Sequence, residues 1–174
     1  GSGFTGTMFV KIAGSANQMI SVNAANAALP GVEIASTGGT VTIGGSYPLR
    51  LSHGLTYTSG AVSIPQTITL AAEPIATVTL ATGPAMVFSN VIFGGNGSET
   101  YVLSNEMRIL GNLTFNSSTT DFDVNGGVLK VGGNITYSGQ GAVGPAQLEL
   151  NGSSDQPLTA VNANVLHGTH TINK

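Results

Sequence analysis

The sequence predicts an all-β solenoid, a fold in which short coils of about 22 residues stack on one another. A nine-residue phrase occurs three times, as LRLSHGLTY at Leu49–Tyr57, MRILGNLTF at Met107–Phe115 and LKVGGNITY at Leu129–Tyr137. Each copy is a strand pattern, a break rich in glycine or asparagine, and a second strand pattern. The last two copies begin 22 positions apart (129 minus 107), which is typical of one supersecondary unit stacked on another.

Short segments of alternating apolar and polar residues follow one another along the whole chain. Such alternation places the apolar side chains on one face of a strand. The breaks contain Gly-Gly, Asn-Gly, Ser-Gly or proline, which favour turns. Only the segment 23–30 (NAANAALP) favours a helix, and its asparagines and final proline limit that helix to a turn or two. Strands are expected around residues 41–43, 67–70, 77–80, 122–124 and 148–150.

The composition favours one module, residues 1–174, because no proline-rich or charged linker divides the chain. Only 7% of the residues are charged, against about 25% in an average soluble protein. Outward positions must therefore be filled largely by Thr, Ser, Asn and Gly. Such a surface protects exposed strand edges poorly against self-association. The basic residues of the phrase (Arg50, Arg108 and Lys130) are expected to point into solvent and to discourage lateral pairing of sheets.

Charge and residue content exclude several classes of function. A net charge of −3 with five scattered Lys and Arg gives no basic stripe for nucleic acid. The absence of cysteine excludes disulfides, thiolate metal sites and cysteine nucleophiles. No apolar run approaches the roughly 18 residues of a membrane span. No nucleophile motif or phosphate loop occurs either, so the sequence predicts a protein that is not an enzyme.

A second and longer repeat joins the two ends of the chain. Residues 10–36 match residues 148–174 without a gap at an offset of 138 (148 minus 10). This match predicts a module that continues in a tandem array or end to end as a subunit; the alternative is a fragment of a longer chain. The interface is expected to contain Val10, Ile12, Gln18, Ile20, Leu148, Leu150, Gln156 and Leu158.

The turns and coils resemble those of a known class of bacterial protein. Segments such as GGNITYSG (132–139) and NGSSDQ (151–156) resemble the β-helical repeats of large secreted surface proteins, including autotransporter-like adhesins. This resemblance implies a non-enzymatic fibre or adhesin at the bacterial surface, with copies of itself and surface glycans as partners. Two alternatives stay open: a carbohydrate-binding or depolymerising spike of phage type, and a β-sandwich completed by a strand from a neighbouring subunit.

Calcium is the one cofactor that the sequence suggests. The segment DFDVNG places oxygen ligands at Asp121, Asp123 and Asn125, followed by a glycine, as in the opening of a calcium loop. The twelfth position of such a loop is normally a bidentate glutamate, but here it is Gly132. The two aspartates could also form a widely spaced pair for glycoside hydrolysis with inversion, because alternate strand residues lie about 7 Å apart.

Threonine pairs raise a last alternative, an ice-binding surface. They occur at residues 40 and 42, 56 and 58, 67 and 69, 77 and 79, and 169 and 171. An ordered ladder requires one pair in register in every coil, and these pairs are irregularly spaced. The sequence therefore favours the simpler interpretation that they are outward residues of ordinary strands, where β-branched side chains are common.

Overall fold

The computed structural model describes residues 9–25, 27–47, 49–72, 77–95, 99–117, 123–138, 146–161 and 169–173. These residues form strands, turns and corners, with no helix. The strands are β1 (Phe9–Gly14), β2 (Gln18–Val22), β3 (Ala28–Gly45), β4 (Leu49–Ser63), β5 (Thr67–Ala72), β6 (Thr77–Ala81), β7 (Val87–Phe88), β8 (Asn90–Gly95), β9 (Thr100–Leu103), β10 (Glu106–Ile109), β11 (Leu113–Ser117), β12 (Asp123–Asn125), β13 (Val128–Val131), β14 (Ile135–Tyr137), β15 (Gln147–Leu150), β16 (Leu158–Ala160) and β17 (His170–Ile172).

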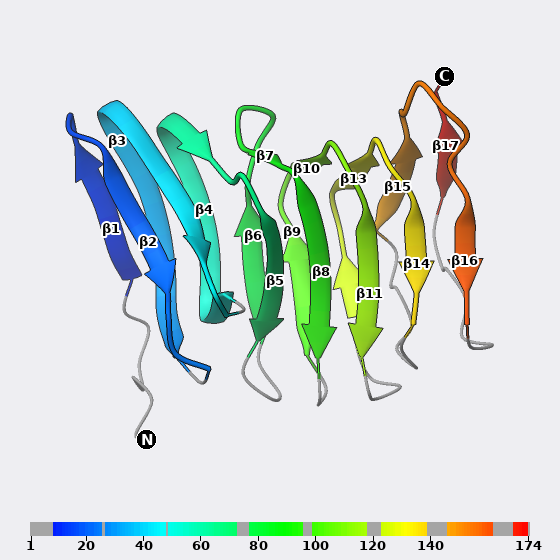
Figure 1. The fold of residues 1–174 in the computed structure, drawn as a ribbon, viewed down its shortest axis with the longest axis horizontal. Coiled ribbons are helices and arrows are strands. Elements are labelled where there is room, and N and C mark those ends of the chain that lie inside the picture. The colour runs from blue at the N-terminus through cyan, green and yellow to red at the C-terminus, as the bar shows by residue number, and fades with distance from the viewer. Residues whose placement is uncertain are drawn as a thin grey trace.

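The strands wind into a β-solenoid of about six turns, with coils about 22 residues apart, which confirms the predicted fold class. Its coils follow one another along the long axis in Figure 1, from β1 and β2 at one end to β16 and β17 at the other. Each turn passes through three faces. The first face contains β5, β8, β11, β14 and β16; the second contains β1, β6, β9 and β12; the third contains β2, β7, β10, β13, β15 and β17.

Two long strands, β3 and β4, bend through all three faces. Leu49 at the start of β4 pairs with β5 on the first face, and Leu55 pairs with β6 on the second. Val62 near its end pairs with Val41 of β3, on the third face. The register between β3 and β4 shifts where the strands turn the corners. These continuous strands join the strands of the first and second faces, together with β2 of the third face, into one twelve-stranded sheet.

Inward side chains form rows that run along the solenoid axis. Phe93, Phe115 and Tyr137 occupy the same position in successive coils of the first face. Their rings stack, with centroid distances of 5.6 and 4.8 Å and interplanar angles of 9° and 15°. This spacing follows from the separation of about 4.8 Å between neighbouring strands. Stacked rows of this kind form the buried core.

Asparagine and glycine shape the corner between the third and first faces. The backbone N–H of Asn112 donates to Oδ1 of Asn90 at 2.7 Å, and that of Asn134 donates to Oδ1 of Asn112 at 2.8 Å. A Cβ added to Gly111 would lie 2.3 Å from Oδ1 of Asn90, so a side chain at position 111 would disrupt this ladder. The Gly-Asn pair of the repeated phrase is therefore a corner in which each coil bonds to the next.

The first copy of the phrase does not stack on the other two, which corrects the simplest interpretation of the repeat. Copies 107–115 and 129–137 run from the third face to the first, and they pair with each other. Copy 49–57 instead runs from the first face to the second. The phrase encodes strand, corner and strand, and this pattern suits more than one corner of the coil.

Three further predictions meet the structure here. The segment 23–30 forms no helix, because Ala28 begins β3 and pairs with Arg50 of the next coil. Pairing between coils thus outweighs the helix propensity of alanine. The β-sandwich alternative is not adopted, since every described strand pair is parallel and a sandwich of hairpins needs antiparallel pairs. No helix in the described ranges is long and apolar enough to cross a membrane.

Candidate functional site

The candidate site is the pair of surfaces at the two ends of the solenoid. At one end, β1 and β2 pair only with β3 among the described strands. At the other end, β16 pairs with β14 and β17 pairs with β15. Each of these end strands therefore presents a row of backbone groups that no described strand covers. Such an edge is a template for a further parallel strand.

One inward row shows what the ends expose. We call it the third-face row, and all its members are apolar. Ile109 and Val131, within the row, are 1% and 0% exposed, whereas Ile172 at its end is 71% exposed. Ile172 is thus a core side chain by position and a surface side chain by exposure. The third-face row runs from Phe88 through Ile109, Val131 and Leu150 to Ile172, and at the N-terminal end of the same face Ile20 pairs with the buried Ile43.

The same contrast occurs on the other two faces. Val10 of β1 is 41% exposed, whereas Val32, its partner in the next coil, is fully buried. Leu158 of β16 is 44% exposed, whereas its partner Ile135 is 1% exposed. Exposure here follows the position of a residue along the axis and not its residue type. A further coil on either end would cover these side chains as the inner coils are covered.

The predicted interface residues divide into two groups. Val10 and Leu158 lie open at the ends, and Ile12 and Ile20 of the first coil are partly buried. Leu148 is buried because β17 covers it, and Leu150 is partly buried beneath the same strand. A neighbouring coil can therefore contact Val10, Leu158, Ile12 and Ile20, whereas Leu148 and Leu150 are already covered by β17.

The two predicted glutamines are partly buried and hold polar positions within the coils. Gln156 donates through Nε2 to the carbonyls of Val131 and Gly133 at 2.8 and 2.7 Å. Its Oε1 accepts from the N–H of Gly152 at 2.8 Å. Gln156 thus fixes a corner within the solenoid. Oε1 of Gln18 is buried and has no hydrogen-bond partner among the described residues.

The matching ends of the sequence do not occupy equivalent places. Residues 10–14 lie on the second face, whereas their counterparts around 148–150 lie on the third. An offset of 138 residues exceeds six coils of 22 residues (132) by six residues, about a quarter of a coil. The sequence match therefore advances the pattern by one face. Contacts between the two ends therefore depend on the rows of inward side chains, and the sequence match between residues 10–36 and 148–174 does not predict them.

The calcium candidate can be placed only in part. Asp121 lies outside the described residues, whereas Asp123 and Asn125 lie on β12 of the second face. Both side chains are partly exposed, and Val124 between them is fully buried, so the two oxygens point outward together. In the described ranges no three His, Asp or Glu side chains gather as a metal site. The carboxylate pair for glycoside hydrolysis also depends on Asp121 and stays a prediction.

The structure reveals a threonine row that the sequence did not indicate. Thr69, Ile92, Thr114, Thr136 and Thr159 point outward from successive coils of the first face, in register. Only Thr69 belongs to one of the predicted pairs. The informative signal was the spacing of 22 or 23 residues between Thr114, Thr136 and Thr159, with Thr69 two coils before Thr114 and Ile92 in the coil between them. The row gives the first face an uncharged outer surface, and its affinity for ice stays a prediction.

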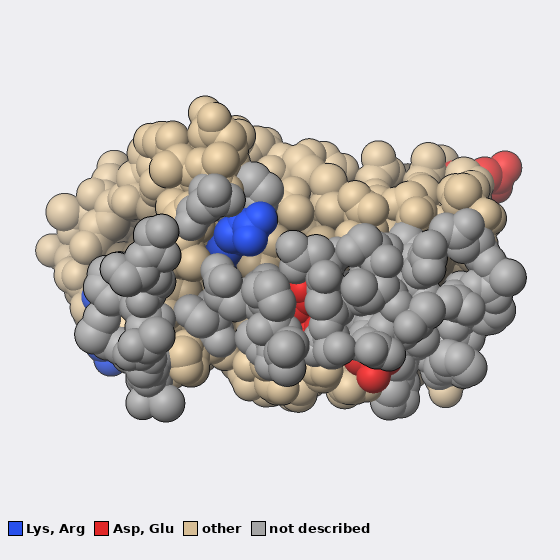
Figure 2. Space-filling model, turned by 90° about the horizontal axis from the view of Figure 1, so that it is seen from below, with Lys and Arg blue, Asp and Glu red and all other residues tan. Residues whose placement is uncertain are grey.

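Charged side chains are sparse, and the best-connected group lies on the third face. Nζ of Lys130 lies 2.8 Å from Oε2 of Glu106 and 3.9 Å from Oε2 of Glu149. The hydrogen bond to Glu106 raises the pKa of Lys130 above its usual value. Among the described residues visible in Figure 2, charged side chains are few and well separated. Such a surface gives little electrostatic protection against self-association.

The three basic residues of the phrase differ in their surroundings. Lys130 is held by two carboxylates, and Arg108 is exposed. Arg50 is partly buried, and its Nε has no hydrogen-bond partner among the described residues. Arg50 lies between the buried Leu49 and Leu51 on the first face, where it pairs with Ala28 and Ala71, so strand alternation places it on the outer side.

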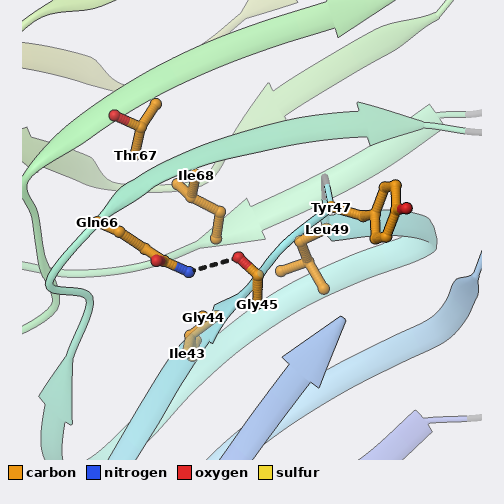
Figure 3. A pocket seen from close by; sticks show the side chains of 8 residues that line it. All are labelled: Ile43, Gly44, Gly45, Tyr47, Leu49, Gln66, Thr67 and Ile68. Atoms are coloured by element: carbon orange, nitrogen blue, oxygen red, sulfur yellow. Dashed lines mark hydrogen bonds between the residues drawn. The ribbon is translucent and has the colours of Figure 1, made fainter. Parts of the chain in front are cut away.

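A small pocket lies at the corner between the third and first faces of the N-terminal coils (Figure 3). Ile43, Leu49 and Ile68 contribute apolar side chains to its lining, and Gln66 donates through Nε2 to the carbonyl of Gly45 at 2.7 Å. The described residues of its lining include no carboxylate, imidazole or cationic group, and Tyr47 is the one titratable side chain among them.

No family model matches the chain, and no curated protein or solved structure matches it either.

Proposed function

We propose that this chain is a non-enzymatic structural module of an extracellular bacterial filament or surface adhesin, in which further solenoid turns stack on its ends. The observation that carries the proposal is the third-face row, in which Ile172 is 71% exposed in a position that is buried in inner coils. The low charge and the Thr-, Asn- and Gly-rich surface support an assembly role, because little repels a neighbouring edge.

Stacking of a second copy along the solenoid axis brings the exposed apolar side chains of the two ends into contact. If β2 of a second copy continues the third face beyond β17 with Ile20 aligned on Ile172, both inward residues of their strands, then Gln18 lies against His170. Burial of an isoleucine side chain contributes about 1.5–3 kcal/mol. Edge-strand hydrogen bonds then add direction, because parallel pairing permits only head-to-tail contact. The neighbouring turn comes from a second copy or from a tandem repeat of the same module.

Sedimentation velocity of the native chain and two variants tests the proposal. The native chain should form larger species as its concentration rises, and electron microscopy should show elongated particles. Ile172→Lys places a charge in the contact and should weaken assembly at least tenfold. Thr171→Lys, an outward position on the same strand, is the matched control and should assemble. A native chain that stays monomeric at all concentrations would contradict the proposal.

A further inference from the structure

An open hollow crosses three successive coils at the corner between the third and first faces, near the C-terminal end. Its volume is about 260 Å³, just below the range of about 300–1,000 Å³ for sites that bind drug-sized molecules. Arg108 and Leu110 of one coil form one wall, Gly132 of the next coil lies on the floor, and Asn151 and Ser153 form the other wall. The hollow is separate from the end surfaces described above.

Glycine at two stacked positions leaves the hollow open. A Cβ on Gly132 would lie 2.4 Å from the carbonyl oxygen of Leu110, and one on Gly152 would lie 2.2 Å from the carbonyl oxygen of Gly132. Close stacking of the coils therefore requires glycine at both positions. As a consequence, the floor of the hollow is backbone, which a ligand can approach closely.

Arg108 is the one charged residue among the described residues that line the hollow. It stacks in register between Val87 and Lys130 on the outer side of the third face. The nearby Glu106 and Glu149 are both engaged by Lys130. Among the described residues no carboxylate forms an ion pair with Arg108. Its guanidinium is thus available to bind an anionic partner. The N–H groups lie in one plane and can donate two parallel hydrogen bonds to a carboxylate.

The remaining lining residues offer an apolar surface and hydrogen-bonding groups, the two kinds of contact that a sugar ring makes. Leu110 is 60% exposed and offers an apolar surface at the rim. Asn151 and Ser153 are exposed and can donate and accept hydrogen bonds on the opposite side. From this combination we propose that the hollow binds a carboxylate-bearing sugar unit of an acidic polysaccharide. Arg108 binds the carboxylate, Leu110 contacts the ring, and Asn151 and Ser153 bind hydroxyls.

Calorimetric titration with trigalacturonate tests the site, with maltotriose as the neutral comparison. The native chain should bind trigalacturonate at least tenfold more tightly than maltotriose. Arg108→Gln should weaken trigalacturonate binding about tenfold or more, because it removes a charge-assisted hydrogen bond. Lys11→Gln removes one positive charge from the far end and should leave the affinity unchanged.

Leu110→Ala supplies a second, charge-neutral probe, and it should weaken trigalacturonate several-fold while circular dichroism stays native. Three outcomes would overturn the proposal: no binding by the native chain at millimolar ligand, equal binding of both trisaccharides, or an Arg108→Gln variant that binds like the native chain. Assembly at the ends is measured separately by sedimentation, so the failure of one proposal leaves the other standing.

Discussion

The N-terminal and C-terminal parts of the solenoid turn their corners in different ways. In the N-terminal part, β3 and β4 extend over 18 and 15 residues and carry the ladder around the corners with shifts of register. In the C-terminal part, strands of three to five residues alternate with Gly-Asn corners, as in β10, β11, β13 and β14. The comparison shows that the regular repeat in the sequence corresponds to the Gly-Asn corners. Coils also stack without that repeat, as β3 and β4 do.

The largest expected effect is in the regular part, at the aromatic stack. Phe115 is 3% exposed between the rings of Phe93 and Tyr137. Phe115→Ala should lower the free energy of unfolding by about 3–5 kcal/mol in urea denaturation, because it empties the centre of the row. Thr114→Ala, outward on the same strand, should cost less than about 0.5 kcal/mol. Equal costs for the two variants would show that the stack is not a core row.

The stability of the N-terminal part should depend on glycine at the corners where β3 and β4 turn. Gly60 has a φ of +106°, and an added Cβ would lie 2.6 Å from Cβ of Ser36. Gly60→Ala should therefore cost about 1–3 kcal/mol in the same assay. Gly94→Ala is the control, since its nearest contact would be Cγ2 of Thr69 at 3.4 Å, and it should change stability by less than about 1 kcal/mol. A Gly60 variant as stable as the native chain would exclude strain at this corner.

The asparagine corner should contribute less than either of these. Asn112→Ala removes the Oδ1 that accepts the N–H of Asn134 at 2.8 Å. The expected loss is about 1–2 kcal/mol by urea denaturation, because that N–H loses its partner in the protein. Asn116→Ala, exposed on β11, should be nearly neutral. The ladder would have no energetic role if both variants behaved alike.

The smallest effects should distinguish two buried tyrosines. Tyr101 donates through its hydroxyl to the carbonyl of Leu70 at 2.9 Å, whereas the hydroxyl of Tyr137 is buried with no partner among the described residues. Tyr101→Phe should lower the melting temperature, and Tyr137→Phe should leave it unchanged or raise it. The reverse order would contradict these assignments.

Tyr137 also predicts a pH dependence of stability. Burial raises the pKa of Tyr137 far above its usual value. Below pH 10 both folded and unfolded chains keep this group protonated; above about pH 10 only the unfolded chain ionises it, so stability falls as pH rises. The fall between pH 10 and 12 should be shallower in Tyr137→Phe.

Sequence patterns were sufficient for the fold class and for the coil length, because Met107–Phe115 and Leu129–Tyr137 form two adjacent corners of one kind. They were insufficient to predict which face of the coil each strand occupies. Leu49–Tyr57 has the same pattern but lies one face away, because a strand-corner-strand phrase does not specify which corner it forms. The exposed ends could be predicted only as apolar segments. Strand pairing was needed to show that Ile20 packs inward against Ile43 and that Ile172 continues the row of Ile109, Val131 and Leu150.

A cysteine cross-link tests the stacked-end account most directly, because the native chain contains no cysteine. Ile20→Cys and Ile172→Cys, introduced in one chain, should lie about 4.8 Å apart (Cα to Cα) across a head-to-tail contact, within the range that a disulfide spans. Oxidation should yield a ladder of covalent multimers on a denaturing gel. Met19→Cys with Ile172→Cys is one residue out of register and should yield little. Assembly without cross-linking of the Ile20 and Ile172 variant would contradict this register, and a covalent dimer from Ile20→Cys alone would show head-to-head contact instead.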